Sequence, residues 1–141
     1  MAIITISRGS FAGGKALATR LSERLSYASL SREQVLHEAA ESFGIAEPEL
    51  VDSLNKSPRY WVQNPGKRLA YVKCVTAVLL RHAGQGSLVY HGHVGHLLLS
   101  ELPQVVRVRV VADIEYRVQA AMQYANLSHD QALARIRRVD H

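Results

Sequence analysis

A glycine-rich stretch near the start of the chain has the residue types and the spacing that bind phosphate groups. From Gly9 to Lys15 the sequence follows the pattern G-x-x-x-x-G-K. Glycines have no Cβ, so successive backbone N–H groups can converge on an oxyanion, and the lysine adds a positive charge that reaches the outer phosphates. We therefore predict a phosphate-binding loop made of Gly9, Ser10, Phe11, Ala12, Gly13, Gly14, Lys15 and Ala16.

The segments on either side of this loop support the prediction. The apolar run from Ile3 to Ile6 predicts a strand, and the leucines Leu17, Leu21 and Leu25 lie on one face of a helix. The N-terminus of that helix would direct its N–H groups at a bound anion. A glycine-rich turn without a ligand is the alternative, but strand, spacing, lysine and helix all agree with the phosphate-binding interpretation.

The last position of the loop departs from the usual motif. Such a loop normally ends in Ser or Thr, whose hydroxyl coordinates Mg²⁺, and this chain has Ala16 there. The change leaves the N–H groups that bind phosphate intact and weakens the positioning of a metal ion. A water molecule can fill the vacant metal position, so Ala16 by itself does not exclude catalysis.

Composition limits the class of protein. The 141 residues are 48% hydrophobic and 21% charged, which fits one globular domain. No apolar run reaches the roughly 20 residues that a membrane-spanning helix needs, so we expect no membrane partner. The single Cys74 and the lack of a leader pattern favour a reduced, cytoplasmic protein. The net charge of +5 suits a polyanionic partner, either a nucleotide or a nucleic acid.

The hydrophobic pattern predicts helices that alternate with strands. Capping boxes at Ser31 to Gln34 and at Ser128 to Gln131 mark two helix starts, and Asp113 is placed to cap a third. The predicted strands cover residues 3–6, 27–30, 87–90 and 105–112. The predicted helices cover residues 17–25, 31–43, 49–54 and 67–82, and two further helices are predicted to begin near residues 114 and 128. This alternation predicts a three-layer α/β/α fold with a mostly parallel sheet, built by one domain over residues 1–141.

Two further places carry candidate site residues. Arg32 begins a predicted helix, where it either contacts a substrate phosphate or pairs with Glu33 or Glu38 on the surface. The loop 91–96, His-Gly-His-Val-Gly-His, follows a predicted strand. Its glycines break any fixed ligand face and no carboxylate or thiol is interleaved, which disfavours a zinc site. A structural turn is a second interpretation, and we favour a ligand-binding loop at the carboxyl end of the strand.

The final predicted helix carries several arginines, among them Arg135 and Arg138. Such a cluster is usually a solvated face. In a phosphate-binding protein it can instead form a lid that closes over a phosphoryl group during its transfer.

These segments together resemble the cytidylate kinase-like family of P-loop proteins. The resemblance rests on residues 4–8 with the glycine loop, on 31–33, on the Tyr-His-Gly-x-x-Gly-His loop at 90–96, and on 108–117 leading into 128–140. It implies a nucleoside monophosphate kinase fold, ATP as phosphoryl donor, CMP or dCMP as acceptor, and Mg²⁺ as cofactor.

The resemblance also implies roles for particular residues. Gly9 to Lys15 would hold the donor phosphates, and the 91–93 turn falls where the family has an Asp-Gly-Arg turn for metal and acceptor phosphate. His91 therefore replaces the family's Asp, and we assign no metal ligand to any side chain. The expected catalytic residues are Lys15, Arg135 and Arg138, the expected substrate-binding residues are Arg8, Arg32, His91, Gly92 and His93, and Asp140 is expected to organise the lid.

In the resembled family a further helix and a last strand follow the Arg-x-Asp at 138–140. We therefore expect this chain to lack them, with 128–141 as the start of the lid region. A sheet without that strand exposes an edge, from which we predict self-association, as a homodimer for example.

Three functions follow as hypotheses. The first is a kinase that transfers the ATP γ-phosphoryl group to CMP or dCMP. The second is a catalytically impaired nucleotide-binding or sensing module, motivated by Ala16 and His91. The third and weakest is a basic nucleic-acid-binding protein, whose binding would depend steeply on salt.

Overall fold

The computed structural model describes residues 2–55, 62–92 and 95–140. Helices and strands alternate along most of the chain, as the sequence predicts. In chain order the elements are β1 (Ile3–Arg8), α1 (Gly14–Leu25), β2 (Ala28–Ser31), α2 (Arg32–Phe43), α3 (Glu47–Leu54), α5 (Pro65–Gln85), β3 (Leu88–Gly92), α6 (Gly95–Leu98), β4 (Val105–Val110), α7 (Ile114–Ala125) and α8 (His129–Asp140).

The described strands form one parallel sheet in the order β2-β3-β1-β4. In the register, Ile6 of β1 lies opposite His91 of β3 and Val108 of β4. Because all these strands run the same way, their carboxyl ends meet at one edge of the sheet. The loop after β1, the turn after β3 and the start of α2 after β2 are therefore neighbours.

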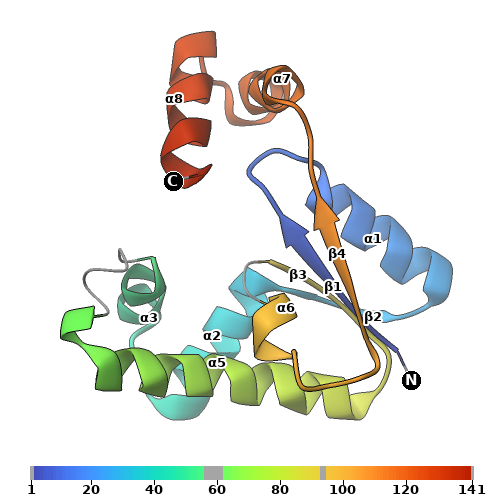
Figure 1. Cartoon of the computed structure of the whole chain (residues 1–141), viewed down its shortest axis with the longest axis vertical. Helices are drawn as coiled ribbons and strands as arrows, with labels where there is room; N and C mark the ends of the chain where they lie inside the picture. The colour runs from blue at the N-terminus through green and yellow to red at the C-terminus, as the bar shows by residue number, and fades with distance from the viewer. Residues whose placement is uncertain (1, 56–61, 93–94, 141) are drawn as a thin grey trace.

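Helices cover both faces of the sheet (Figure 1). On one face, Ile6 and Val89 pack against Ala18 of α1. On the other face, Ile3, Leu88 and Tyr90 belong to a larger core with α2 and α5. This arrangement confirms the predicted three-layer α/β/α fold with a parallel sheet.

Local sequence signals account for several helix ends. The Ser31 hydroxyl accepts a hydrogen bond from the Gln34 N–H while the Gln34 side chain accepts one from the Ser31 N–H. The same reciprocal pair joins Ser128 and Gln131, and the Asp113 carboxylate caps α7 at the Tyr116 N–H. The capping predictions are confirmed, whereas α5 extends beyond the predicted 67–82 at both ends and the short α6 was not predicted as a helix.

The helix pair α7 and α8 stands beyond the carboxyl ends of β1 and β4 (Figure 1). It has its own small core of Val118, Ala121, Ala132 and Ile136, each at most 1% exposed. The pair is thus held to the rest of the chain by specific contacts with the loop after β1, described below.

Within the described residues, β4 pairs with β1 on one side and forms an edge of the sheet. Its Val106 is 55% exposed. The predicted self-association through this edge stays a prediction. None of the described helices has both the length and the apolar character to cross a membrane.

Candidate phosphate-binding site

The predicted loop connects the end of β1 to the start of α1. Gly13 is the N-cap of α1 and has φ 88°, a left-handed conformation that glycine adopts without strain. The Leu17 N–H donates to the Gly13 carbonyl at 3.1 Å, so the helix is formed from its first turn. The N–H groups of Gly14, Lys15 and Ala16 have no partner within the helix by its geometry and are left for an anion.

Gly14 allows α1 to pack directly on the strand that precedes the loop. A Cβ at this position would lie 2.4 Å from the Cβ of Arg8 and 3.3 Å from its Cα. The N-terminus of α1 can therefore lie this close to the end of β1 only because residue 14 is glycine. This close approach fixes the direction in which the first-turn N–H groups point.

Phe11 anchors the tip of the loop to the helix pair. Its backbone is left-handed, with φ 57°, and its ring packs against the core between α7 and α8. The Arg135 guanidinium lies 5.5 Å from the centre of the ring, a cation–π distance. Arg135, predicted as a catalytic residue, is thus brought to the loop by a contact with Phe11.

Arg117 of α7 makes a second connection, which the sequence analysis did not predict. Its Nε donates to the Ser10 carbonyl at 2.9 Å, and its two terminal nitrogens donate to the two carboxylate oxygens of Asp140 at 2.8 Å each. The Asp140 hydrogen bonds raise the pKa of Arg117, although partial burial opposes this. Asp140, expected to organise the lid region, is thus paired with Arg117.

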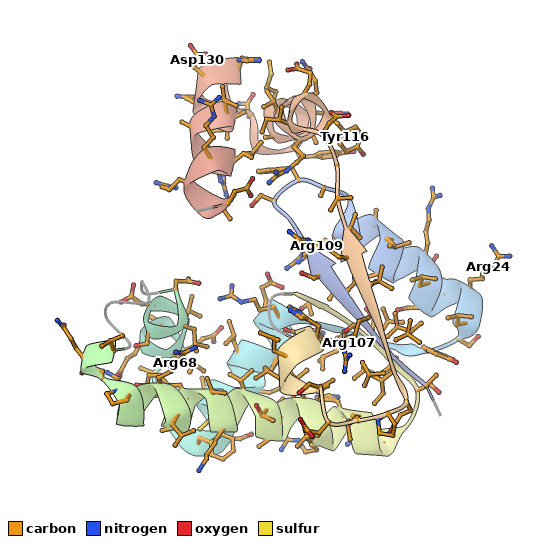
Figure 2. The ribbon with its side chains drawn as sticks, viewed as in Figure 1. Arg24, Arg68, Arg107, Arg109, Tyr116 and Asp130 are labelled. Carbon is orange, nitrogen blue, oxygen red and sulfur yellow. The ribbon has the colours of Figure 1, made fainter. Side chains whose placement is uncertain are left out.

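A pocket of about 360 Å³ lies between the loop, the end of β4 and the helix pair. Three arginines line it, Arg8, Arg109 and Arg117, together with the carboxylate of Asp140. Arg109 and Arg107 lie on the same face of β4 and project away from α1 (Figure 2). Arg107 donates to the Ser100 carbonyl at 2.9 Å, so Arg109 is the one that faces the pocket.

The predicted acceptor residues lie on the other side of β1, around β3. Arg8 crosses to α2, where its terminal nitrogen lies 2.7 Å from the Glu33 carboxylate. Burial alone would raise the pKa of Glu33, but its own backbone hydrogen bond and the charge of Arg8 outweigh it and lower that pKa. Arg32 donates to Asn55 at 2.9 Å instead of pairing with Glu33 or Glu38.

Gly92 and Arg32 are packed together. A Cβ on Gly92 would lie 2.6 Å from the Arg32 Cβ and 2.8 Å from the Tyr90 hydroxyl. Burial raises the pKa of Tyr90 to about 12, so this hydroxyl stays protonated. Glycine at 92 therefore lets Arg32 lie against the end of β3, while predicted His93 lies outside the described residues.

His91 lies on the same face of the sheet as Arg8, because it pairs with Ile6 and side chains alternate along β1. The residue is 6% exposed, and its Nδ1 has no hydrogen-bond partner among the described residues. Burial, followed by the charge of Arg8, lowers its pKa, and the charge of Lys15 acts in the same direction. His91 is a neutral ring beneath the ion pair of Arg8 and Glu33.

Two predicted catalytic residues, Lys15 and Arg138, have exposed side chains. Lys15 lies on the first turn of α1, and Arg138 lies on α8. The charge of Lys15 is nevertheless one of those that lower the pKa of His91.

A comparison with known protein families finds a match. The sequence pattern of the cytidylate kinase-like family matches residues 3–141. The chain belongs to the cytidylate kinase-like family. A comparison with curated protein sequences finds no match.

Solved structures resemble this family member in fold. An uncharacterized protein from Eubacterium ventriosum superposes with a TM-score of 0.73 at 18% identity, over 99% of this chain and 71% of that one. The protein TT1252 from Thermus thermophilus gives 0.66 at 18% identity, over 97% and 79%. A shikimate kinase from Acinetobacter baumannii in complex with shikimate gives 0.51 at 16% identity, over 99% and 75%. The fold is that of the P-loop kinases.

The Mg²⁺ expected for this cytidylate kinase-like chain finds no fitting set of ligands among the described residues. Position 16 presents a methyl group and position 91 a buried imidazole, where hard oxygen ligands are preferred. The carboxylates of Glu33 and Asp140 are bound to Arg8 and Arg117. In the described part of the chain, no three His, Cys, Asp or Glu side chains gather in a way that would hold a metal ion.

Proposed function

We propose that this protein binds the phosphates of ATP at loop 9–15 and transfers the γ-phosphoryl group to a nucleoside monophosphate, CMP or dCMP. The observation that carries the proposal is the start of α1, where Gly13 leaves the first-turn N–H groups for an anion next to Lys15. Membership of the cytidylate kinase-like family supports the reaction class, and CMP or dCMP is proposed as the acceptor from the sequence resemblance alone.

The donor and acceptor would occupy opposite sides of β1. The first turn of α1 and Lys15 would hold the donor phosphates, and the helix pair would cover them. Arg32, which contacts Gly92 and Asn55, would bind the acceptor phosphate, and Arg8 would lie between the two sides. Catalysis would then come from positioning and positive charge, because phosphoryl transfer requires little covalent chemistry from the protein.

The lid arginines would act on the transferred group. Arg135 lies over the Phe11 ring at the loop, so a small rotation of its side chain would redirect its charge to a phosphate. Arg138 is one helical turn further on the same helix, α8, and is exposed. Positive charge of this kind stabilises the transition state of phosphoryl transfer.

A second candidate function is nucleotide binding without turnover. Ala16 and the buried His91 favour it, because both positions lack the metal ligand that the family motif implies. The anion-binding N–H groups do not depend on these two side chains. Such a protein would sense or sequester a nucleotide.

The test is ADP formation from ATP with CMP, dCMP, UMP, AMP and GMP offered in turn as acceptors. Kinase activity predicts ADP that depends on the acceptor and disappears in Lys15→Ala. Lys73→Ala, which removes an exposed lysine from α5, is the matched control and should keep full activity. Stabilisation by ATP without turnover would establish the second function instead, and a protein that bound only nucleic acid, with steep salt dependence, would refute both.

A further inference from the structure

Two positions that face the phosphate site differ from what a metal-assisted site uses. Ala16 presents a methyl group directly after Lys15, at the position where a hydroxyl would coordinate Mg²⁺. His91 lies near the end of β3, next to β1, and is a buried residue on the same face of the sheet as Arg8. Neither group is an oxygen ligand, and Mg²⁺ requires near-octahedral oxygen coordination.

Several charged side chains surround the site. Burial, followed by the charges of Arg8 and Lys15, lowers the pKa of His91, and an imidazole carries no negative charge in either protonation state. Arg109 and Arg117 line the adjoining pocket together with Arg8. The nearby carboxylates of Glu33 and Asp140 are each neutralised by an arginine at 2.7 to 2.8 Å.

We infer that this site binds the nucleotide phosphates as the free anion, with their charge neutralised by protein cations and without a protein-held Mg²⁺. The inference rests on the proposed nucleotide binding and specifies the form of the ligand. It concerns how the phosphates are held and is therefore compatible with either candidate function.

The geometry also suggests a consequence of having histidine instead of aspartate at position 91. A carboxylate at position 91 would lie on the same face of the sheet as Arg8, where it would compete with phosphate for positive charge. A metal ion normally relieves that competition by bridging the carboxylate and the phosphate. With a neutral ring at 91, the charge of Lys15 is left to the phosphate, whereas Arg8 is already paired with Glu33.

The experiment measures ADP binding by isothermal titration calorimetry, once in EDTA and once in excess Mg²⁺. For the natural chain we expect the Kd to differ by less than about threefold between the two conditions. The double variant Ala16→Thr with His91→Asp restores both metal ligands and should bind about tenfold or more tightly with Mg²⁺ than in EDTA. Ala16→Thr with His91→Asn has nearly the same shape without the charge and should show a much smaller gain.

Each outcome decides one question. Tightening of ADP binding by tenfold or more on adding Mg²⁺ to the natural chain would overturn the inference while leaving nucleotide binding established. Binding of ADP in neither condition would instead refute the proposed function. Should circular dichroism show that His91→Asp does not fold, the comparison of the two conditions on the natural chain decides by itself.

Discussion

Replacing Gly14 by alanine tests the packing on which the phosphate site depends. The added Cβ would lie 2.4 Å from the Arg8 Cβ, whereas carbon atoms in favourable contact are about 3.5–4.0 Å apart. The Arg8 Cβ is attached to the backbone of a central strand and cannot move aside as the end of a side chain can. The start of α1 must therefore shift away from β1 by more than about 1 Å.

The cost follows from overpacking. Inserting a methyl group into a well-packed contact destabilises a protein by about 1–3 kcal/mol. We expect this loss in the free energy of unfolding, measured by urea denaturation. For a chain of this length each kcal/mol lowers the Tm by roughly 4 °C. The same shift moves the first-turn N–H groups, so Gly14→Ala should also lose most of the stabilisation by ATP.

Gly84→Ala is the matched control. Gly84 lies near the end of α5, its φ is not positive, and a Cβ there would meet no atom within 4 Å. The substitution should leave the protein unchanged or stabilise it by up to about 1 kcal/mol. If Gly14→Ala were as stable as Gly84→Ala and kept its response to ATP, the close contact between α1 and β1 would not matter and the reasoning would be refuted.

Three other predictions concern the lid, the buried histidine and the sheet edge. Asp140→Asn should weaken the contact with Arg117 and lower the free energy of unfolding by roughly 0.5–1 kcal/mol. It should also speed amide hydrogen exchange in α8, and unchanged exchange would show that this contact does not hold α8 in place. Because the pKa of His91 is lowered in the folded state, the unfolded chain takes up its proton first on acidification, so stability is complete above pH 6.5 and falls below it. His91→Gln should remove that part of the pH dependence in thermal denaturation, and identical profiles would count against it. Light scattering should show self-association that Val106→Lys on β4 reduces, and a monomer at every concentration would disprove it.

The fold follows from local patterns that are readable in the sequence. The apolar run at 3–6, the glycine loop and the leucines of α1 define a strand–loop–helix unit, and each predicted strand has its observed counterpart. The capping residues Ser31, Asp113 and Ser128 make the predicted hydrogen bonds because a cap involves only neighbours in the chain. The parallel order of the strands follows from the intervening helices.

The candidate site was only partly predictable, because several of its contacts join residues far apart in the chain. Arg117 and the Ser10 carbonyl are 107 residues apart, and no local signal distinguishes Arg117 from the other arginines of the C-terminal helices. Phe11 is predicted only as part of the phosphate-binding loop, yet its partly buried ring also packs against the core between α7 and α8. The pairing of Arg8 with Glu33 likewise depends on β2, β3 and β1 lying side by side.

The measurement that tests the central claim most directly is the thermal stability of the protein with and without ATP. Ligand at about 100 times its Kd stabilises the folded state by about 2.7 kcal/mol, which is a readily measured rise in Tm. We predict this rise for the natural chain and for Lys73→Ala, and its loss in Lys15→Ala. No rise in the natural chain, or an equal rise in Lys15→Ala, would contradict nucleotide binding at the loop between β1 and α1.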